Sequence, residues 1–165
     1  MADRNITERL QPSILDRLTD DDRHKTSENP SERVIDIRKL RQIIQRDLSW
    51  LLNTSNLHGV IDADQFPHAA TSVLNYGVPD ATGDFAHMQR ADEVRLAIQK
   101  AIELFEPRII DGSLNVISRT EDAKRQPVIV FDIVADMWAE PLPTELYLRS
   151  QFDTTTGQLS LEQGG

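Results

Sequence analysis

The stretch Leu104-Phe105-Glu106-Pro107-Arg108 divides the chain into two halves with different hydrophobic periods. Apolar residues recur every three or four positions before it, as on a helix, and every second position after it, as on a strand. Proline cannot continue a helix and favours extended geometry in the residue before it. Glu106 and Arg108 are therefore expected to project together, about 7 Å apart at their backbones. They are either ordinary solvated charges at a helix end or a fixed acid–base pair that binds another protein.

Two long helices are expected before this break. The first has a start signal at Asn29-Pro30-Ser31-Glu32, which combines a capping residue, a proline suited to the first turn and an acid that completes a capping box. It should end near Leu52, where turn-forming residues follow. The second should run from about Gln89 to Phe105. Apolar residues at steps of three and four predict the buried faces, which are Ile37, Leu40, Ile44, Leu48 and Leu51 on the first helix and Val94, Ile98, Ala101, Ile102 and Phe105 on the second.

Residues 53–90 look irregular, apart from a short helix predicted over residues 69–74 that Gly77 would end in a left-handed conformation. This region holds four possible metal ligands, which are His58, Asp62, Asp64 and His68. Their spacing matches no metal motif, and a calcium loop would need a glycine that is missing here. We therefore interpret the cluster as a polar loop and expect no metal.

Strands are predicted after the break. Residues 114–117 and 145–152 alternate apolar with polar side chains, and residues 158–161 can pair back after a turn at residues 153–157. Residues 128–134 are almost continuously apolar, which predicts a strand covered on both faces. Short connections favour antiparallel hairpins. The fold class is therefore α+β, with N-terminal helices packed on a small antiparallel sheet of three to four strands in the C-terminal half.

Composition narrows the function. A chain of 165 residues without cysteine is long enough for one domain and cannot form disulfides. Residues 59–165 contain 17 acids and 8 bases, which supplies the whole net charge of −9 and argues against nucleic acid as a partner. No apolar run is long enough for a membrane span, and the N-terminus does not resemble a secretory signal. A soluble cytoplasmic protein is expected.

The N-terminal part is predicted to be a leader. Residues 12–18 form a short apolar island that suits an amphipathic helix or a docking peptide, and residues 19–29 are a polar linker. We expect residues 1–28 to be flexible and residues 29–165 to form a single α+β domain. Leu15 and Leu18 would either dock on a partner or pack on their own domain.

An enzyme would need paired acids, a nucleophile with its base, or metal ligands. Glu103 and Glu106 are three residues apart, but two acids at one helix end do not make the cleft of a glycosidase. No phosphate-binding glycine loop is present, so no cofactor is expected. A non-enzymatic protein is predicted.

Five motifs together resemble the TssE family of type VI secretion baseplate proteins, which is related to a wedge protein of contractile-tailed bacteriophages. The motifs are Ser13-Ile14-Leu15-Asp16-Arg17-Leu18, Arg46-Asp47-Leu48-Ser49-Trp50-Leu51-Leu52-Asn53-Thr54, Ser72-Val73-Leu74-Asn75-Tyr76-Gly77-Val78-Pro79-Asp80, Phe105-Glu106-Pro107-Arg108 and Asp153-Thr154-Thr155-Thr156-Gly157. The resemblance extends over nearly the whole chain.

The resemblance implies a structural role at a membrane-docked baseplate. The expected partners are the wedge proteins TssF, TssG and TssK and the TssB–TssC sheath. It implies that Glu106, Pro107 and Arg108 hold the protein in the wedge, and that strands exchanged with the first sheath ring start polymerisation. The family is often labelled lysozyme-like, so a peptidoglycan hydrolase is the alternative.

The sequence predicts two contacts with these partners. The strands over residues 145–152 and 158–161, with Leu146 and Leu148 on the first, would offer an open sheet edge. Arg108 would make a bidentate contact with a partner carboxylate, and Glu106 would accept from the partner. Glu106→Ala or Arg108→Ala should then weaken wedge binding and leave thermal melting nearly unchanged.

Overall fold

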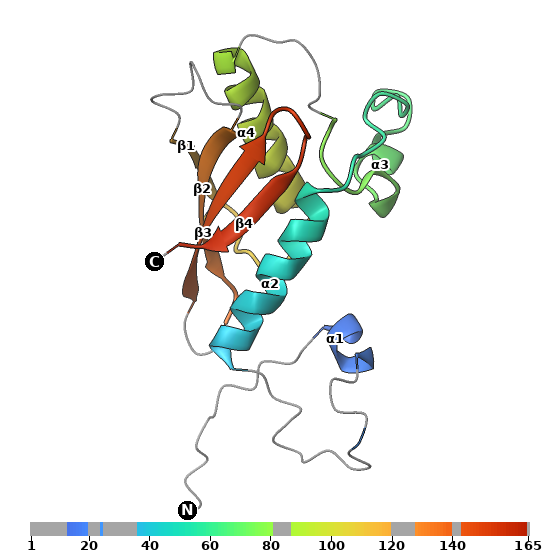
Figure 1. Ribbon diagram of the computed structural model, residues 1–165. Coiled ribbons are helices and arrows are strands. Elements are labelled where there is room, and N and C mark those ends of the chain that lie inside the picture. Colours follow the sequence, from blue (N-terminus) through green and yellow to red (C-terminus); the bar gives the residue numbers. More distant parts are fainter. Residues whose placement is uncertain are drawn as a thin grey trace, which may run out of the picture.

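The computed structural model describes residues 13–19, 24, 36–80, 87–119, 128–139 and 143–164, with only the backbone described over residues 87–90 (Figure 1). None of the helices in these residues has the length and apolar content that a bilayer crossing requires. The elements are α1 (Ile14–Leu18), α2 (Ile37–Leu52), α3 (Pro67–Ala70), the 3-10 helix η2 (Val73–Asn75), α4 (His87–Phe105), β1 (Asn115–Ser118), β2 (Val128–Met137), β3 (Thr144–Asp153) and β4 (Leu159–Gln163).

The strands form one antiparallel sheet in the order β1-β2-β3-β4, so each strand pairs with its neighbour in the chain. This confirms the predicted α+β class, with helices first and a meander after the Pro107 break. Helix α4 lies against β1, α2 lies against β4, and the two helices contact each other. Side chains of β2 that face the helices, such as Phe131 and Ile133, are fully buried.

Four of the five residues predicted on the buried face of each long helix are buried, whereas Ile37 and Phe105 are only partly buried. In α2 the buried residues are Leu40, Ile43, Ile44, Leu48, Leu51 and Leu52. Helix α2 begins at Ile37, because Asp36 is extended (φ −82°, ψ 169°) and its side chain accepts from the Lys39 N–H at 2.7 Å. The helix therefore does not continue back to the predicted start at Asn29, which itself lies outside the described residues. Helix α4 begins within two residues of its predicted start at Gln89.

One expectation about the sheet was wrong. The continuous apolar run of β2 predicted cover on both faces, but Val130 and Val134, which point away from the helices, are only partly buried. No described helix lies over that face. Asp132 is buried there by two arginines, since Arg119 Nε donates to it at 2.6 Å and Arg149 Nε at 3.1 Å. Burial raises the pKa of Asp132, but these hydrogen bonds outweigh it and hold the pKa below its ordinary value.

The segment between α2 and α4 differs from the prediction in one detail. Residues 69–74 were expected to form one short helix. The structure instead places α3 and η2 on either side of Ser72, which is extended (ψ 171°) and caps η2 through its hydroxyl. Gly77 follows with a positive φ of 116°, as expected for a glycine that ends this segment.

Candidate functional site

Glu106 follows the last residue of α4 and lies in a turn. Its N–H still donates to Ile102 O (2.9 Å), and its C=O accepts from Ile109 N–H (3.2 Å). Pro107 is exposed at the corner, and Ile109 makes a bridge to Met137 of β2. The Pro107 break therefore leads the chain directly from the helix layer to the sheet. It does so through a turn, where the sequence predicted an extended segment.

The carboxylate of Glu106 is buried and bound by Arg108. Arg108 Nε donates to Glu106 Oε1 at 2.6 Å, Arg108 Nη2 donates to Oε2 at 2.5 Å, and the Arg108 backbone N–H donates to Oε1 at 3.2 Å. The prediction that the two side chains project together is confirmed. The interpretation of Glu106 as an ordinary surface charge is wrong, because Glu106 is only 5% exposed.

These two residues begin a longer chain of alternating charges. Arg108 Nη2 also donates to Asp47 Oδ2 at 2.7 Å. Asp47 Oδ1 accepts from Arg46 Nε (2.9 Å) and Nη2 (2.7 Å), and Arg46 Nη1 donates to Asp16 Oδ1 at 2.6 Å. We call Glu106, Arg108, Asp47, Arg46 and Asp16 the ion-pair chain. It joins the end of α4 to α2, and α2 to the leader helix α1.

The charges in this chain shift one another's pKa values. Burial lowers the pKa of Arg108, but hydrogen bonds and charge from Glu106, followed by those from Asp47, raise it above its ordinary value. Burial raises the pKa of Asp16, and hydrogen bonds from Arg46 and Ser13 more than reverse this, so the pKa is lowered. Asp16 would therefore release Arg46 only in acid.

Helix α1 is bound to α2 by the ion pair between Asp16 and Arg46. Leu15 is 48% exposed and Leu18 is 78% exposed, and none of the α1 residues is buried. The sequence left open whether the leader packs on its own domain, and neither Leu15 nor Leu18 is buried here. The contact is polar, because Arg46 and Asp16 form an ion pair whose side chains are 34% and 10% exposed.

Two aromatic contacts lie at or next to residues of the ion-pair chain. Arg46 lies 4.8 Å from the ring centroid of Trp50, and the Tyr76 ring meets Phe105 edge-to-face with centroids 5.3 Å apart. Burial, followed by the negative charges of Asp47 and Glu106, raises the pKa of Tyr76. The segment after α2 is thus packed against Phe105, at the end of α4 beside Glu106.

The predicted sheet edge needs a correction. Strand β3 lies between β2 and β4, so its backbone is paired on both sides. Leu146 and Leu148 are each 1% exposed and face the helices. They belong to the core and cannot contact a partner directly. Among the C-terminal strands it is β4 that lies at an edge.

Helix α2 covers part of this edge. The Asp153 N–H donates to Gln158 O, so these two residues form a hydrogen-bonded pair. Such pairs alternate along an antiparallel ladder, and the backbone groups of Leu159, Leu161 and Gln163 therefore point away from β3. Asn53 Nδ2 donates to Leu159 O (2.8 Å) and Asn53 Oδ1 accepts from Leu159 N–H (2.9 Å), as a paired strand would. Gln45 Nε2 donates to Leu161 O at 2.9 Å. Within the described residues, the Leu161 N–H and the backbone of Gln163 have no partner.

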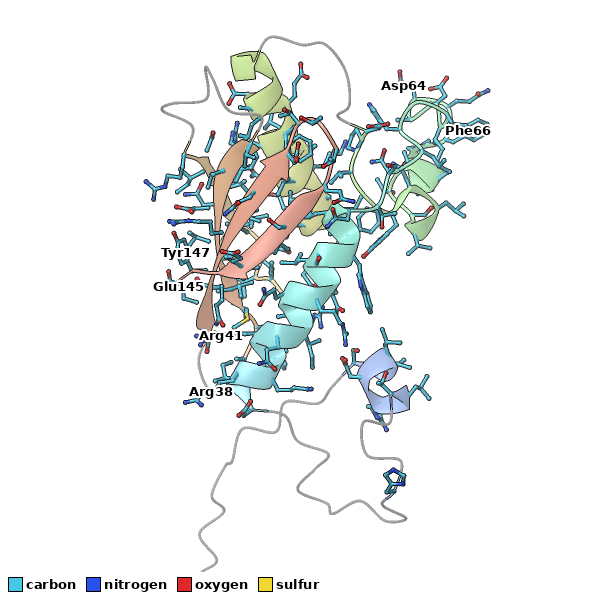
Figure 2. The ribbon with its side chains drawn as sticks, viewed as in Figure 1. Arg38, Arg41, Asp64, Phe66, Glu145 and Tyr147 are labelled. Atoms are coloured by element: carbon cyan, nitrogen blue, oxygen red, sulfur yellow. The ribbon has the colours of Figure 1, made fainter. Side chains whose placement is uncertain are left out.

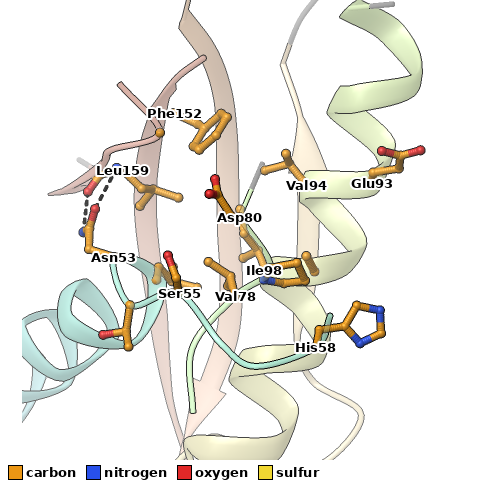
Figure 3. A pocket seen from close by; sticks show the side chains of 15 residues that line it. Asn53, Ser55, His58, Val78, Asp80, Glu93, Val94, Ile98, Phe152 and Leu159 are labelled. Atoms are coloured by element: carbon orange, nitrogen blue, oxygen red, sulfur yellow. Dashed lines mark hydrogen bonds between the residues drawn. The ribbon is translucent and has the colours of Figure 1, made fainter. Parts of the chain in front are cut away.

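A pocket of about 290 Å³ lies beside the end of α2, α4 and the β3–β4 turn (Figure 3). Val78, Ile98 and Phe152 contribute apolar lining, and Asp80 and Glu93 are its acids. Figure 3 shows Asp80 pointing toward Phe152 and Glu93 directed away from it. Neither Glu103 nor Glu106 lines the pocket, so it lacks the acid pair on which the hydrolase alternative was based.

Among the candidate metal ligands, Asp62 has backbone partners of its own. Asp62 Oδ1 accepts from the backbone N–H groups of Asp64 (3.0 Å) and Gln65 (3.2 Å), which makes it a turn residue. The part of the chain that the structure describes contains no group of three or more His, Asp or Glu side chains that could hold a metal ion.

Sequence reasoning identified Glu106, Pro107 and Arg108 but missed Asp16, Arg46 and Asp47 as parts of the same site. Arg46 and Asp47 stood at the head of a quoted motif, yet nothing in their spacing pointed to Arg108, which is 61 residues from Asp47. Only the packing of α2 against α4 brings them together.

A family model described as baseplate wedge protein gp25 matches residues 38–142. The match spans more than half of the chain and contains four of the five residues of the ion-pair chain. No curated protein and no solved structure shows significant similarity to this chain.

Proposed function

The chain belongs to the baseplate wedge protein gp25 family, which is also the family of TssE, and we propose that it serves as a structural subunit of a type VI secretion baseplate. Family membership gives it a baseplate role alongside other baseplate proteins. The finer proposal is a cytoplasmic position at a membrane-docked baseplate, in a wedge with TssF, TssG and TssK. There it would start assembly of the TssB–TssC sheath.

The ion-pair chain carries this proposal, because it favours a holding function over hydrolysis. Both carboxylate oxygens of Glu106 are bound by Arg108, and Glu103 is exposed on α4, where Gln99 donates to it. A general acid needs a raised pKa in a cleft, opposite a second carboxyl. Purified protein is therefore expected to leave peptidoglycan intact in a zymogram. Lysis that disappears in Glu106→Gln would favour the hydrolase.

Arg108 is the proposed contact with the wedge. The bidentate partner contact expected from the sequence is replaced by an internal one, because Arg108 Nε and Nη2 already bond to Glu106 and Asp47. The Arg108 side chain is still 27% exposed, and its Nη1 has no acceptor in the described part of the chain. Nη1 would donate to a carboxylate or carbonyl of a wedge protein, beside the exposed ring of Pro107.

Arg108→Lys tests this contact, with capture compared at equal folded fractions. Lysine keeps a positive charge next to Glu106 but loses the planar fork that serves Glu106, Asp47 and a partner together. Capture of co-expressed TssF and TssG is expected to weaken about tenfold or more. Arg95→Lys is the control, since within the described part of the chain Arg95 makes just an i,i+3 pair with Asp92 on α4. Equal capture by both variants, at equal folded fractions, would remove Arg108 from the interface.

The open end of β4 is the proposed template for the sheath. A strand added beside β4 would pair with the Leu161 N–H and with Gln163, beyond the stretch that Asn53 and Gln45 cover. These amides block addition over Leu159, so an incoming strand is directed to the C-terminal end of β4. In this proposal the sheath contacts backbone groups of β4, and not Leu146 and Leu148, as the sequence had suggested.

Gln163→Pro tests the template. Gln163 lies opposite Leu148 at a position whose N–H points away from β3, so proline removes an outward donor and leaves the ladder intact. Sheath nucleation by purified TssB–TssC is expected to fall about tenfold, as for the loss of one or two net hydrogen bonds. Gln163→Ala keeps the N–H and should nucleate normally. Unimpaired nucleation by the proline variant would exclude this edge.

A further inference from the structure

Residues 53–80, here called the arm, form an ordered segment with its apolar side chains on the outside. Leu57, Val60, Phe66, Val73 and Leu74 are between 46% and 80% exposed. None of residues 53–76 is buried. Figure 2 shows Asp64 and Phe66 at the outer end of the arm, directed away from the sheet and from α2. Helix α3 and η2 contact chiefly each other.

The arm keeps this shape through its polar side chains. Asn75 Nδ2 donates to Ala70 O (2.9 Å), and Asn75 Oδ1 accepts from Leu57 N–H (2.9 Å), which ties three parts of the arm together. Asn56 N–H donates to Val78 O (3.0 Å) and Val78 N–H donates to Thr54 O (2.8 Å), which closes its base. Hydrogen bonds therefore order the backbone, while the apolar side chains, which would normally form a core, face water.

The arm also carries negative charge only. It contains Asp62, Asp64 and Asp80 and no lysine or arginine. A second copy of this chain is a poor match, because each copy carries a net charge of −9. An incoming strand is a poor match too, since turns and side-chain caps use much of the arm's backbone. A helix with an apolar face and basic flanks fits both features.

We infer that the arm is a docking surface for a basic amphipathic helix of another protein. Phe66 and Val60 would anchor in the apolar face of that helix, and Asp64 would pair with one of its lysines or arginines. Because the arm is already ordered, binding loses little conformational entropy. Phe66, Val60 and Asp64 do not belong to the ion-pair chain, so this surface can be tested without any type VI protein.

Two synthetic helical peptides of about five turns test this inference on the full chain. One alternates leucine with lysine in an amphipathic pattern, and the other replaces each lysine by glutamate. In an amide NMR titration at physiological salt, the lysine peptide is expected to shift signals of residues 53–80 and to saturate. The glutamate peptide is expected to cause no such shifts. Shifts scattered over the acidic C-terminal half, or equal binding of both peptides, would overturn the inference.

Matched variants locate the contact. Phe66→Ser and Val60→Ser are each expected to weaken the lysine peptide about tenfold, as for loss of an anchor residue. Asp64→Asn should weaken it mainly at low salt. Leu96→Ser is the control, because Leu96 on α4 is 55% exposed and Phe66 is 54% exposed. Phe66 and Leu96 are equally exposed, so their serine variants lose a similar fraction of buried side chain, and affinities are compared at equal folded fractions. Unchanged affinity in both serine variants of the arm would contradict the docking surface.

Discussion

Replacing Glu106 by alanine is expected to lower the free energy of unfolding by about 3 kcal/mol, because it leaves the guanidinium of Arg108 partly buried with only Asp47 as a partner. For a chain of this length the melting temperature should fall by roughly 10 °C. Urea unfolding of the wild type and the variant measures the difference. The sequence alone had suggested almost no change in melting, and burial of Glu106 reverses that expectation.

Glu103→Ala is the matched control. Glu103 lies on the same helix and is exposed, so its loss should change the free energy of unfolding by less than about 0.5 kcal/mol. A Glu106→Ala protein that melts like the Glu103→Ala protein would show that the ion-pair chain does not contribute to folding. A loss of wedge binding in Glu106→Ala then has to be compared at equal folded fraction, since part of it would come from unfolding.

Gly77→Ala is expected to be about as damaging, at about 3 kcal/mol. The positive φ of Gly77 (116°) is one that residues with a side chain rarely adopt. An added Cβ would lie 2.1 Å from the backbone O of Thr54. Relief requires Thr54 to move, and Thr54 O accepts the Val78 N–H that closes the base of the arm. Urea unfolding together with amide hydrogen exchange measures the effect, with faster exchange expected over residues 54–78.

Gly59 offers the comparison within the same arm. A Cβ on Gly59 meets nothing within 4 Å, and its φ is not in the left-handed region. Gly59→Ala should therefore leave stability unchanged or raise it by about 0.5 kcal/mol, since alanine restricts the unfolded chain. If both alanine variants behave alike, the close approach of Gly77 to Thr54 cannot be what shapes the arm.

The two damaging substitutions concern the same region. Tyr76 lies next to Gly77, packs on Phe105 and is close enough to Asp47 and Glu106 for their charges to raise its pKa. A shift of Gly77 would therefore disturb the contact between Tyr76 of the arm and Phe105, which precedes Glu106. The proposed wedge contact at Arg108 and the proposed helix-docking arm share this base, although they face different partners.

Most of the fold was predictable from local pattern. The step of three and four along α2 identified Leu40, Ile44 and Leu48 as core, and the strand alternation placed Val116 inside. Errors arose where the sequence period was ambiguous. The apolar run of β2 resembles a strand with a hydrophobic layer on both faces. On the face away from the helices, however, Asp132 is covered by Arg119, which follows β1, and by Arg149 of β3. Such cover comes from neighbours that no local window contains.

The candidate site was predictable only in part for the same reason. Glu106 and Arg108 could be paired by their spacing, but neither the burial of Glu106 nor its link through Asp47 and Arg46 to Asp16 could be foreseen. Those partners lie at separations of 30 and 61 residues. Likewise, alternation in β3 and β4 identifies two strands, whereas sheet order decides which of them has an open edge.

Taken by itself, the order of residues determined where helices give way to strands and which side of each element is apolar. It also carried the motifs of the baseplate family. Backbone geometry repeats over a few residues, so these properties depend only on short stretches of sequence. Only the tertiary structure decided that a glutamate next to an exposed proline is buried, that Leu146 and Leu148 are core, and that the arm turns its apolar side chains to water. A charge is buried or solvated, and an edge paired or open, according to what the rest of the molecule places beside it.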